Sequence, residues 1–321
     1  MNRICELLNV SFPLLQAGMG GIAVPRLAAA VSNAGGAGIV ALYKHSTREI
    51  AALLQETSEL AAHPFGINLI PEVVDERVLS EQVAAILEVA DSRLFFTFFG
   101  LPPARICQQI KQAGFTLLIQ IGNLVEARQA TALGADALIV QGSQAGGHHL
   151  GHEELDDLLI NIQQLKLGLP LVAAGGIATG HDFARVYSLG ASGCLCGTLF
   201  VATKESAGHA IFKKRILEST AQDTVVTDLF EIGWPGRPHR VLRNEVVEKG
   251  KTLPPTFIGR TRIFNKPYLI PRFSAAVPTE TTTGNIEQMA MYCGTSCQHI
   301  NTLRSVAEVM QEFRLMSQMV F

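Results

Sequence analysis

Short apolar runs alternate with longer amphipathic stretches from the N-terminus to about residue 218. Runs of this length suit strands, and the stretches between them are long enough for crossover helices, so the alternation predicts parallel strands joined by helices. The eight predicted strands are residues 13–17, 37–42, 65–70, 94–98, 116–121, 137–140, 171–174 and 193–196. Predicted helices include residues 25–34, 75–90, 102–113, 124–133, 153–165 and 181–189.

Eight strand–helix units within this length have the size of a (β/α)8 TIM barrel. A doubly wound sheet is the alternative, but such a sheet usually has fewer strands and a reversal in their order. The predicted fold class is therefore α/β, with a (β/α)8 barrel formed by residues 1–219.

The strand–helix alternation stops after the barrel. Residues 220–284 contain seven prolines and predict an irregular lid or subdomain with little regular helix. Residues 286–292 and 300–316 then have the pattern of closing helices, so we expect residues 285–321 to pack back on the barrel.

Composition narrows the function classes. The 321 residues are 48% hydrophobic and 17% charged, which excludes a largely disordered chain. The net charge of −2 argues against a general nucleic-acid surface, because binding phosphates needs concentrated Lys and Arg. No apolar run approaches the ~18 residues of a membrane span, so we expect a cytoplasmic protein without membrane attachment. However, residues 237–272 hold nine Lys or Arg and two Glu, a local excess that could serve an anionic partner or solvate an exposed segment.

The six cysteines are too sparse for a disulfide framework. Cys293 and Cys297 lack a second Cys or His pair at zinc spacing, although His299 is close in sequence. We therefore expect reduced thiols and no metal.

Two glycine-rich loops follow the seventh and eighth predicted strands, where barrels commonly bind phosphate. Gly175 and Gly176 form one loop, and Gly197 with Thr198 forms the other. Glycine lets backbone N–H groups approach an anion, and a threonine adds a hydroxyl donor. Tight turns that need glycine for packing are the alternative explanation, and they account less well for two such loops at these positions.

The loop after the first strand runs from Gln16 to Gly21, and its backbone could lie against a flat cofactor at the barrel mouth. Met19 in this loop could touch the ring or fill the core. Asn68, at the end of the third strand, could bond to polar groups of a cofactor or cap the next segment.

Three histidines follow the sixth strand, within the segment from Gln141 to His152. Imidazole exchanges protons near neutrality, so a histidine beside a cofactor is a candidate acid or base. Zinc binding is the alternative, but there is no H-E-x-x-H pattern, and the preceding glycines argue against a rigid helical ligand array. We expect His148 to face the site and His149 and His152 to lie at the surface or at a helix start.

These motifs together resemble the nitronate monooxygenase and 2-nitropropane dioxygenase family and the related flavin-dependent enoyl-ACP reductases. The resemblance covers nearly the whole chain and rests on residues 16–21, 28–36, 65–68, 145–148, 175–177, 197–198 and 240–244. Several positions depart from the commonest family pattern: among them, Gly18 stands where proline is usual, Gln144 stands where glutamate is frequent, and an extra His-Leu precedes Gly151.

The resemblance implies a barrel that holds FMN without a covalent link, with the substrate between the barrel and the irregular segment. It implies that His148 is the catalytic acid/base. The cofactor-binding residues that it implies are Ala17, Gly18, Met19, Asn68, Gln120, Gln141, Gly146, Gly147, Gly175, Gly176, Leu195, Cys196, Gly197 and Thr198.

Three functions stay open at this point. The first is a nitronate monooxygenase that oxidises a small alkyl nitronate with O2 and needs no NAD(P)H. The second is an NAD(P)H-dependent enoyl-thioester reductase, or a quinone reductase. An anionic acyl carrier protein would then be steered by residues 213–215 and by the basic segment 237–272. The third is a barrel that only binds FMN or a sugar phosphate. The sequence does not predict an oligomeric state or a preference between NADH and NADPH.

Overall fold

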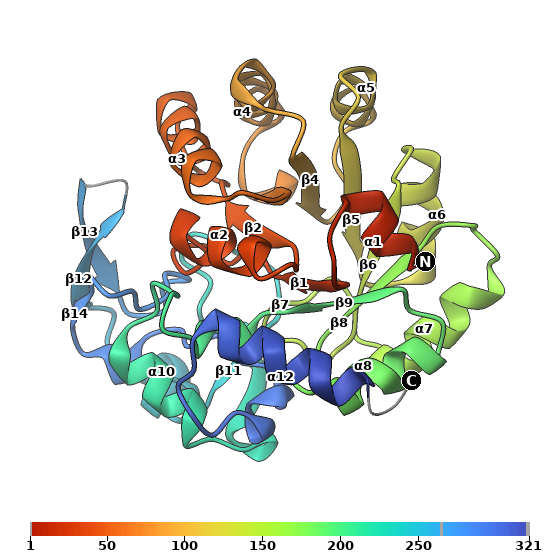
Figure 1. The fold of residues 1–321 in the computed structure, drawn as a ribbon. Coiled ribbons are helices and arrows are strands. Elements are labelled where there is room, and N and C mark those ends of the chain that lie inside the picture. The colour runs from red at the N-terminus through yellow and green to blue at the C-terminus, as the bar shows by residue number, and fades with distance from the viewer. Residues whose placement is uncertain (1, 264–265, 319–321) are drawn as a thin grey trace.

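The computed structural model describes residues 2–263 and 266–318, and it confirms the predicted α/β barrel (Figure 1). All eight predicted strands are present as parallel neighbours. They are β1 (Leu14–Gln16), β2 (Gly38–Ala41), β3 (Phe65–Leu69), β4 (Leu94–Phe99), β5 (Thr116–Ile121), β6 (Ala137–Gln141), β8 (Leu171–Ala174) and β9 (Gly193–Cys196). Their order in the sheet is β1-β9-β8-β6-β5-β4-β3-β2. A parallel bridge between Leu15 and Ala37 joins the first strand to the second and closes the barrel.

Helices surround the strands on the outside of the barrel (Figure 1). They are α2 (Pro25–Asn33), α3 (Thr47–Leu60), α4 (Glu76–Val89), α5 (Ala104–Gln112), α6 (Leu124–Ala132), α7 (Leu155–Gln164) and α8 (Gly180–Ser188). Polar side chains set their starts, because Ser46 with Glu49 and Thr179 with Asp182 form capping boxes at α3 and α8. None of the helices in the described part of the chain has the length and apolar character of a membrane span.

The strands are buried on both faces, as in other parallel barrels. In β5, Leu118 points to an interior cluster, whereas Leu117 and Ile119 belong to the larger core under the helices. The N-terminal helix α1 (Arg3–Leu8) contributes Ile4 and Leu8 to the interior cluster. That end of the barrel is thereby plugged with apolar side chains.

The segment after the barrel, residues 220–284, is called the lid below, and it is more regular than its prolines predict. Two short helices, α9 (Thr198–Val201) and α10 (Ala210–Leu217), precede the lid. The lid itself contains η2 (Ala221–Asp223), β10 (Thr224–Thr227), β11 (His239–Leu242), α11 (Glu245–Lys249), η3 (Gly250–Thr252), β12 (Phe257–Ile263), β13 (Lys266–Pro271) and β14 (Thr283–Gly284). These strands build two sheets, ordered β10-β11-β7 and β13-β12-β14. Strand β7 (Gly147–His148) comes from the barrel, in the loop after β6. Regular pairing persists because the prolines lie mainly in the connections and at sheet edges.

The prediction of a closing helix over residues 286–292 is wrong. Residues 286–292 form only η4 (Ile286–Gln288), and the following residues are extended against β11, where Leu242 N–H donates to Met291 O at 2.9 Å. Residues 288–291 are all buried, and a short buried run has no period that separates helix from strand. The second closing helix is α12 (Val306–Gln318), which begins six residues later than predicted and follows η5 (Thr295–His299).

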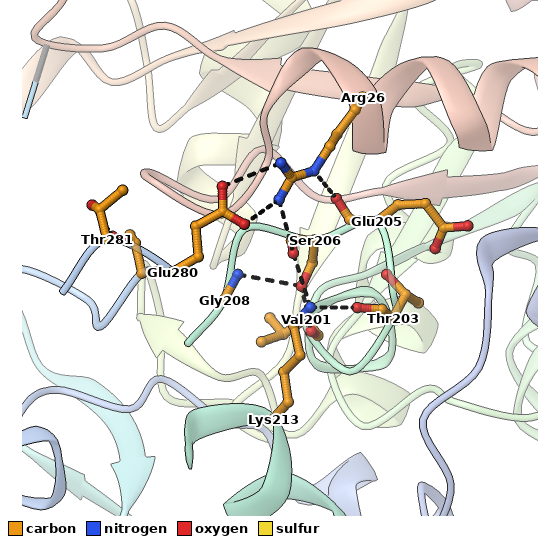
Figure 2. A network of polar contacts seen from close by, with 10 residues as sticks. Arg26, Val201, Thr203, Glu205, Ser206, Gly208, Lys213, Glu280 and Thr281 are labelled. Carbon is orange, nitrogen blue, oxygen red and sulfur yellow. Dashed lines mark hydrogen bonds and ion pairs between the residues drawn. The ribbon is translucent and has the colours of Figure 1, made fainter. Parts of the chain in front are cut away.

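Polar contacts around Arg26 attach the lid to the barrel on one side (Figure 2). The Arg26 guanidinium forms two hydrogen bonds with the Glu280 carboxylate, at 3.1 and 2.6 Å, and also donates to Glu205 O and Ser206 O. The Lys213 ammonium donates to Thr203 O and Ser206 O, at 2.7 and 2.9 Å, and so closes the loop beneath. The lid residue Glu280 is therefore bound by Arg26, which also holds the loop of residues 203–206.

Candidate active site

A cavity of about 630 Å³ lies between the carboxyl ends of the barrel strands and the lid. Sites of TIM barrels lie at this face. All fifteen residues that the sequence assigned to the site line the cavity: Ala17, Gly18, Met19, Asn68, Gln120, Gln141, Gly146, Gly147, His148, Gly175, Gly176, Leu195, Cys196, Gly197 and Thr198. The structure thus brings together residues that are far apart in sequence, from Ala17 to Thr198.

One part of the cavity wall is mainly backbone and is called the glycine side: Gly175, Gly176, Gly197 and Thr198. Gly175 and Gly176 have φ of +110° and +70°, a region that other residues rarely adopt. A Cβ on Gly197 would meet only ordinary contacts, with Met19 Sδ at 3.5 Å and Ala17 Cβ at 3.8 Å, so the space above it is available to a ligand. Backbone N–H groups exposed in this way suit a phosphate.

Two other glycines of the site also have a packing reason. A Cβ on Gly146 would lie 2.5 Å from Gly294 N, and one on Gly18 would lie 2.3 Å from Asn68 Cβ. Asn68 is fixed in turn, because its Oδ1 accepts from Thr97 Oγ1 at 2.9 Å. These glycines therefore bring cavity segments into close contact, whether or not they also touch a cofactor.

Gln141 holds the backbone that carries His148. Its Nε2 donates to His148 O, and its Oε1 accepts from Leu150 N–H, both at 2.9 Å. On the other side of the same backbone, β7 pairs with β11, with His148 opposite His239. The position of His148 is therefore set from the barrel and from the lid at once.

The His148 imidazole is buried among aromatic rings. His148, Trp234 and Tyr292 are together called the aromatic side of the cavity. The imidazole stacks on Trp234 with centroids 3.7 Å apart and planes at 16°, and Tyr292 lies 5.2 Å away. Its Nε2 is buried and has no hydrogen-bond partner in the described structure. Burial lowers the pKa of His148 to about 2, and the nearby charges of His239 and Arg237 add to this effect. The imidazole is therefore neutral at physiological pH, and its Nε2 makes no hydrogen bond within the described structure.

Trp234, which completes this aromatic side, is tied to the barrel. Its Nε1 donates to Glu72 Oε1 at 2.6 Å, and Arg237 forms an ion pair with the same carboxylate. Lys44 Nζ donates to Gly233 O at 2.6 Å. Sequence reasoning missed Trp234, Tyr43, Lys44 and Tyr292, all of which line the cavity. The only sequence signal was that Trp234 is the sole tryptophan and lies among glycines and prolines.

The expectation for His149 is wrong, whereas that for His152 is confirmed. His149 is 4% exposed, and its Nε2 lies 2.7 Å from Ala145 O, away from the His148 ring. The reason is the alternation of side chains along the extended β7 segment, whose second face is covered by the barrel. His152 is exposed. No cluster of three metal-binding side chains occurs within residues 2–263 and 266–318.

The basic segment 237–272 has much of its charge paired within the chain. Ion pairs join Arg237 to Glu72, Arg243 to Glu248, Lys249 to Glu245 and Lys251 to Glu231, while Arg240 donates to Ser143 O and Arg272 to Pro254 O. These cations therefore neutralise acidic groups and fix loops of the lid.

A sequence model described as nitronate monooxygenase matches residues 1–315 of the chain. The chain is 35% identical to the (3aS,4S,5R,7aS)-5-hydroxy-7a-methyl-1-oxo-octahydro-1H-indene-4-carboxyl-CoA dehydrogenase of Mycobacterium tuberculosis, over 77% of this chain and 67% of that protein. It is 28% identical to a probable nitronate monooxygenase of Staphylococcus haemolyticus, over 94% of each protein.

Solved structures with similar folds cover almost all of the chain. FabK from Thermotoga maritima has a TM-score of 0.83 at 27% identity, over 99% of this chain and 96% of that one. A nitroalkane oxidase from Streptomyces ansochromogenes has a TM-score of 0.80 at 26% identity, over 99% of this chain and 98% of that one. The likeness thus includes the lid as well as the barrel.

Proposed function

Because the chain belongs to the nitronate monooxygenase family and is an oxidoreductase, we propose that it oxidises alkyl nitronates with O2, using FMN bound in the cavity beneath the lid. The observation that carries the proposal is the His148 imidazole, which lines the same cavity as the glycine side and whose buried Nε2 has no hydrogen-bond partner in the described structure. A proton-transfer group and an anion-binding loop thus share one enclosed space.

The residues of the cavity fit FMN. Gly175, Gly176 and Gly197 would hold the phosphate through backbone N–H groups that no side chain of their own covers, and Thr198 would add its backbone N–H beside them. The loop from Ala17 to Met19 would lie along the ring, with Asn68 and Gln120 as polar contacts. When bound, FMN supplies the two-electron acceptor for the substrate.

A nitronate has already lost the proton of its reacting carbon, so His148 would exchange a proton beside the bound substrate rather than remove one from that carbon. Burial makes the imidazole a weak base, and an anionic substrate beside it would raise its pKa and favour proton uptake. Tyr43 and Tyr292 do not compete for this role, because burial raises the pKa of Tyr43 to about 12 and that of Tyr292 well above its usual value. Both phenols remain protonated and can only donate or accept hydrogen bonds.

A second candidate is an NAD(P)H-dependent reductase of acyl thioesters. It is favoured by the relative at 35% identity, whose name specifies a CoA ester as its substrate. In this case His148 would protonate the product carbon, and an acyl carrier protein or CoA would approach across the lid. The pairing of Arg237, Lys249 and Lys251 within the chain reduces the charge available for such a partner.

Anaerobic bleaching of the flavin absorbance band decides between the two. The holoenzyme is mixed in separate cuvettes with an alkyl nitronate, with NADH and with NADPH. Rapid bleaching by the nitronate with little response to the nicotinamides supports the proposal. Bleaching by NAD(P)H alone would reject it in favour of the reductase, and bleaching by none of the three would reject both.

A further inference from the structure

Lys44 stands in the cavity wall in an unusual backbone conformation. It follows β2 at the carboxyl end of the barrel, lines the cavity and has a φ of +64°. A residue with a long side chain rarely adopts this left-handed region, and such conformations persist where the surroundings enforce them, often at functional sites. The backbone conformation of Lys44 therefore makes this residue a candidate for a role in the cavity.

Within the part of the chain that the structure describes, the Lys44 ammonium makes one hydrogen bond, to Gly233 O at 2.6 Å. An ammonium carries three donors, so a ligand can engage the others without breaking this contact. Nζ also lies 5.9 Å from the centre of the Tyr43 ring. Lys44 is exposed as a whole, but burial of part of its side chain lowers the pKa of the ammonium, so an anionic partner would favour its charged form.

Lys44 is also close enough to His148 to affect it electrostatically. Its positive charge is among the causes that lower the pKa of His148. Glu280, a carboxylate that also lines the cavity, is already paired with Arg26 (Figure 2). A negatively charged ligand next to His148 would therefore meet Lys44 without opposition from this acid.

We propose that Lys44 is a specificity-determining residue that binds the anionic group of the substrate, so that the enzyme selects a nitronate over the neutral nitroalkane. The nitronate oxygens would accept from the Lys44 ammonium, and the adjacent carbon would lie against His148. This inference rests on the proposed function. A charge-assisted hydrogen bond of this kind accounts for roughly 10- to 100-fold in affinity.

The test compares Lys44→Asn with Lys44→Met, because asparagine tolerates positive φ and keeps the variant folded if methionine does not. Lys251→Asn is the matched control, since it removes a lid cation that pairs with Glu231 and does not line the cavity. We expect KM for propane-2-nitronate to rise about 10- to 100-fold in the Lys44 variants, with kcat and the KM for 2-nitropropane changed less than about threefold. Equal increases of KM for both compounds would show that Lys44 only anchors the Gly233 loop, and would overturn the proposal.

A binding measurement separates this inference from the proposed function. Trp234 is the sole tryptophan and follows the residue that Lys44 contacts, so its fluorescence in the holoenzyme reports on the site. We expect butyrate to change this fluorescence saturably and butyramide to have little effect, with the butyrate response lost in Lys44→Asn and kept in Lys251→Asn. If nitronates are not oxidised but this pattern holds, the anion site stands and the proposed reaction falls. If nitronates are oxidised but butyrate and butyramide bind equally, the Lys44 proposal is wrong.

Discussion

The glycine side and the aromatic side of the cavity are built in opposite ways. On the glycine side, Gly175, Gly176 and Gly197 present backbone, and the loops are continuous with barrel strands. On the aromatic side, His148, Trp234 and Tyr292 present large side chains, and Trp234 comes from the lid.

This difference indicates a division of tasks. Backbone on rigid strands suits a group that stays bound through every turnover, such as a cofactor phosphate. Side chains that meet across the barrel and the lid suit a molecule that enters and leaves in every turnover, as a substrate does. Substitutions on the two sides should therefore have separable effects on FMN content and on turnover.

The largest expected effect is the loss of turnover in His148→Ala. If His148 is the acid/base as proposed, its removal should lower kcat roughly 100- to 10,000-fold, while the flavin absorbance of the purified protein is retained. Steady-state rates and the flavin-to-protein absorbance ratio check both points. His152→Ala, at an exposed position, is the control and should stay within about twofold of wild type. Loss of FMN from His148→Ala would break the division between the two sides.

The converse effect is expected on the glycine side. In Gly197→Val, the new Cβ would meet only ordinary contacts, and the side chain would occupy the space proposed for the phosphate. The affinity for FMN should fall about 10- to 100-fold, because the proposed hydrogen bonds of the phosphate to backbone N–H groups would be blocked. Fluorescence titration of the apoprotein with FMN measures this. Gly208→Ala, whose Cβ would also meet only ordinary contacts at 3.5 Å, should bind FMN normally. Unchanged FMN affinity in Gly197→Val would refute the phosphate site.

A smaller effect is expected from Trp234→Ala. Aromatic pairs contribute about 0.5 to 1.5 kcal/mol, so losing the ring stacked on His148 should lower kcat/KM about 2- to 10-fold, with FMN retained. Trp234→Phe keeps a ring but removes the hydrogen bond to Glu72, and it should recover most of the activity. If Trp234→Phe is as impaired as Trp234→Ala, the contact with Glu72, rather than the ring, positions the loop.

The smallest effect concerns stability against pH. The folded-state pKa of His148 is about 2, far below its ordinary value of about 6.5, so the unfolded chain binds more protons between these pH values. Stability should therefore be lost as pH falls below about 6.5, by about 1 kcal/mol from this residue between pH 6.5 and 5.5. Urea unfolding at both pH values measures the loss. His148→Gln does not titrate and should show a shallower decline, and an equal decline would place the proton uptake elsewhere.

The sequence predicted the barrel well because each strand is a short apolar run bounded by polar or glycine residues, a pattern that depends on local order alone. The glycine side was predictable for the same reason, since its loops directly follow strands. His149 was misjudged because its burial needs the folded barrel loop and the lid together. Its ring lies against Ala145 O of the loop, and its N–H donates to Pro238 O of the lid. Lys44 gave no signal, and Trp234 gave only that of a sole tryptophan. Their places in the cavity depend on long-range contacts, of Lys44 with Gly233 at 189 positions and of Trp234 with His148 at 86 positions.

The pairing of β7 with β11 makes His148 part of the sheet of the lid, although it lies in a barrel loop by sequence. The backbone of His148 is therefore held by the barrel loop and by the lid, two segments that could otherwise be replaced independently of each other. A chimera that replaces residues 220–284 with those of a relative would therefore have to bring residues 145–152 with it, or the imidazole would move relative to the rest of the cavity. We expect new activities in this fold to arise by joint replacement of these two segments, with the phosphate loops left as they are.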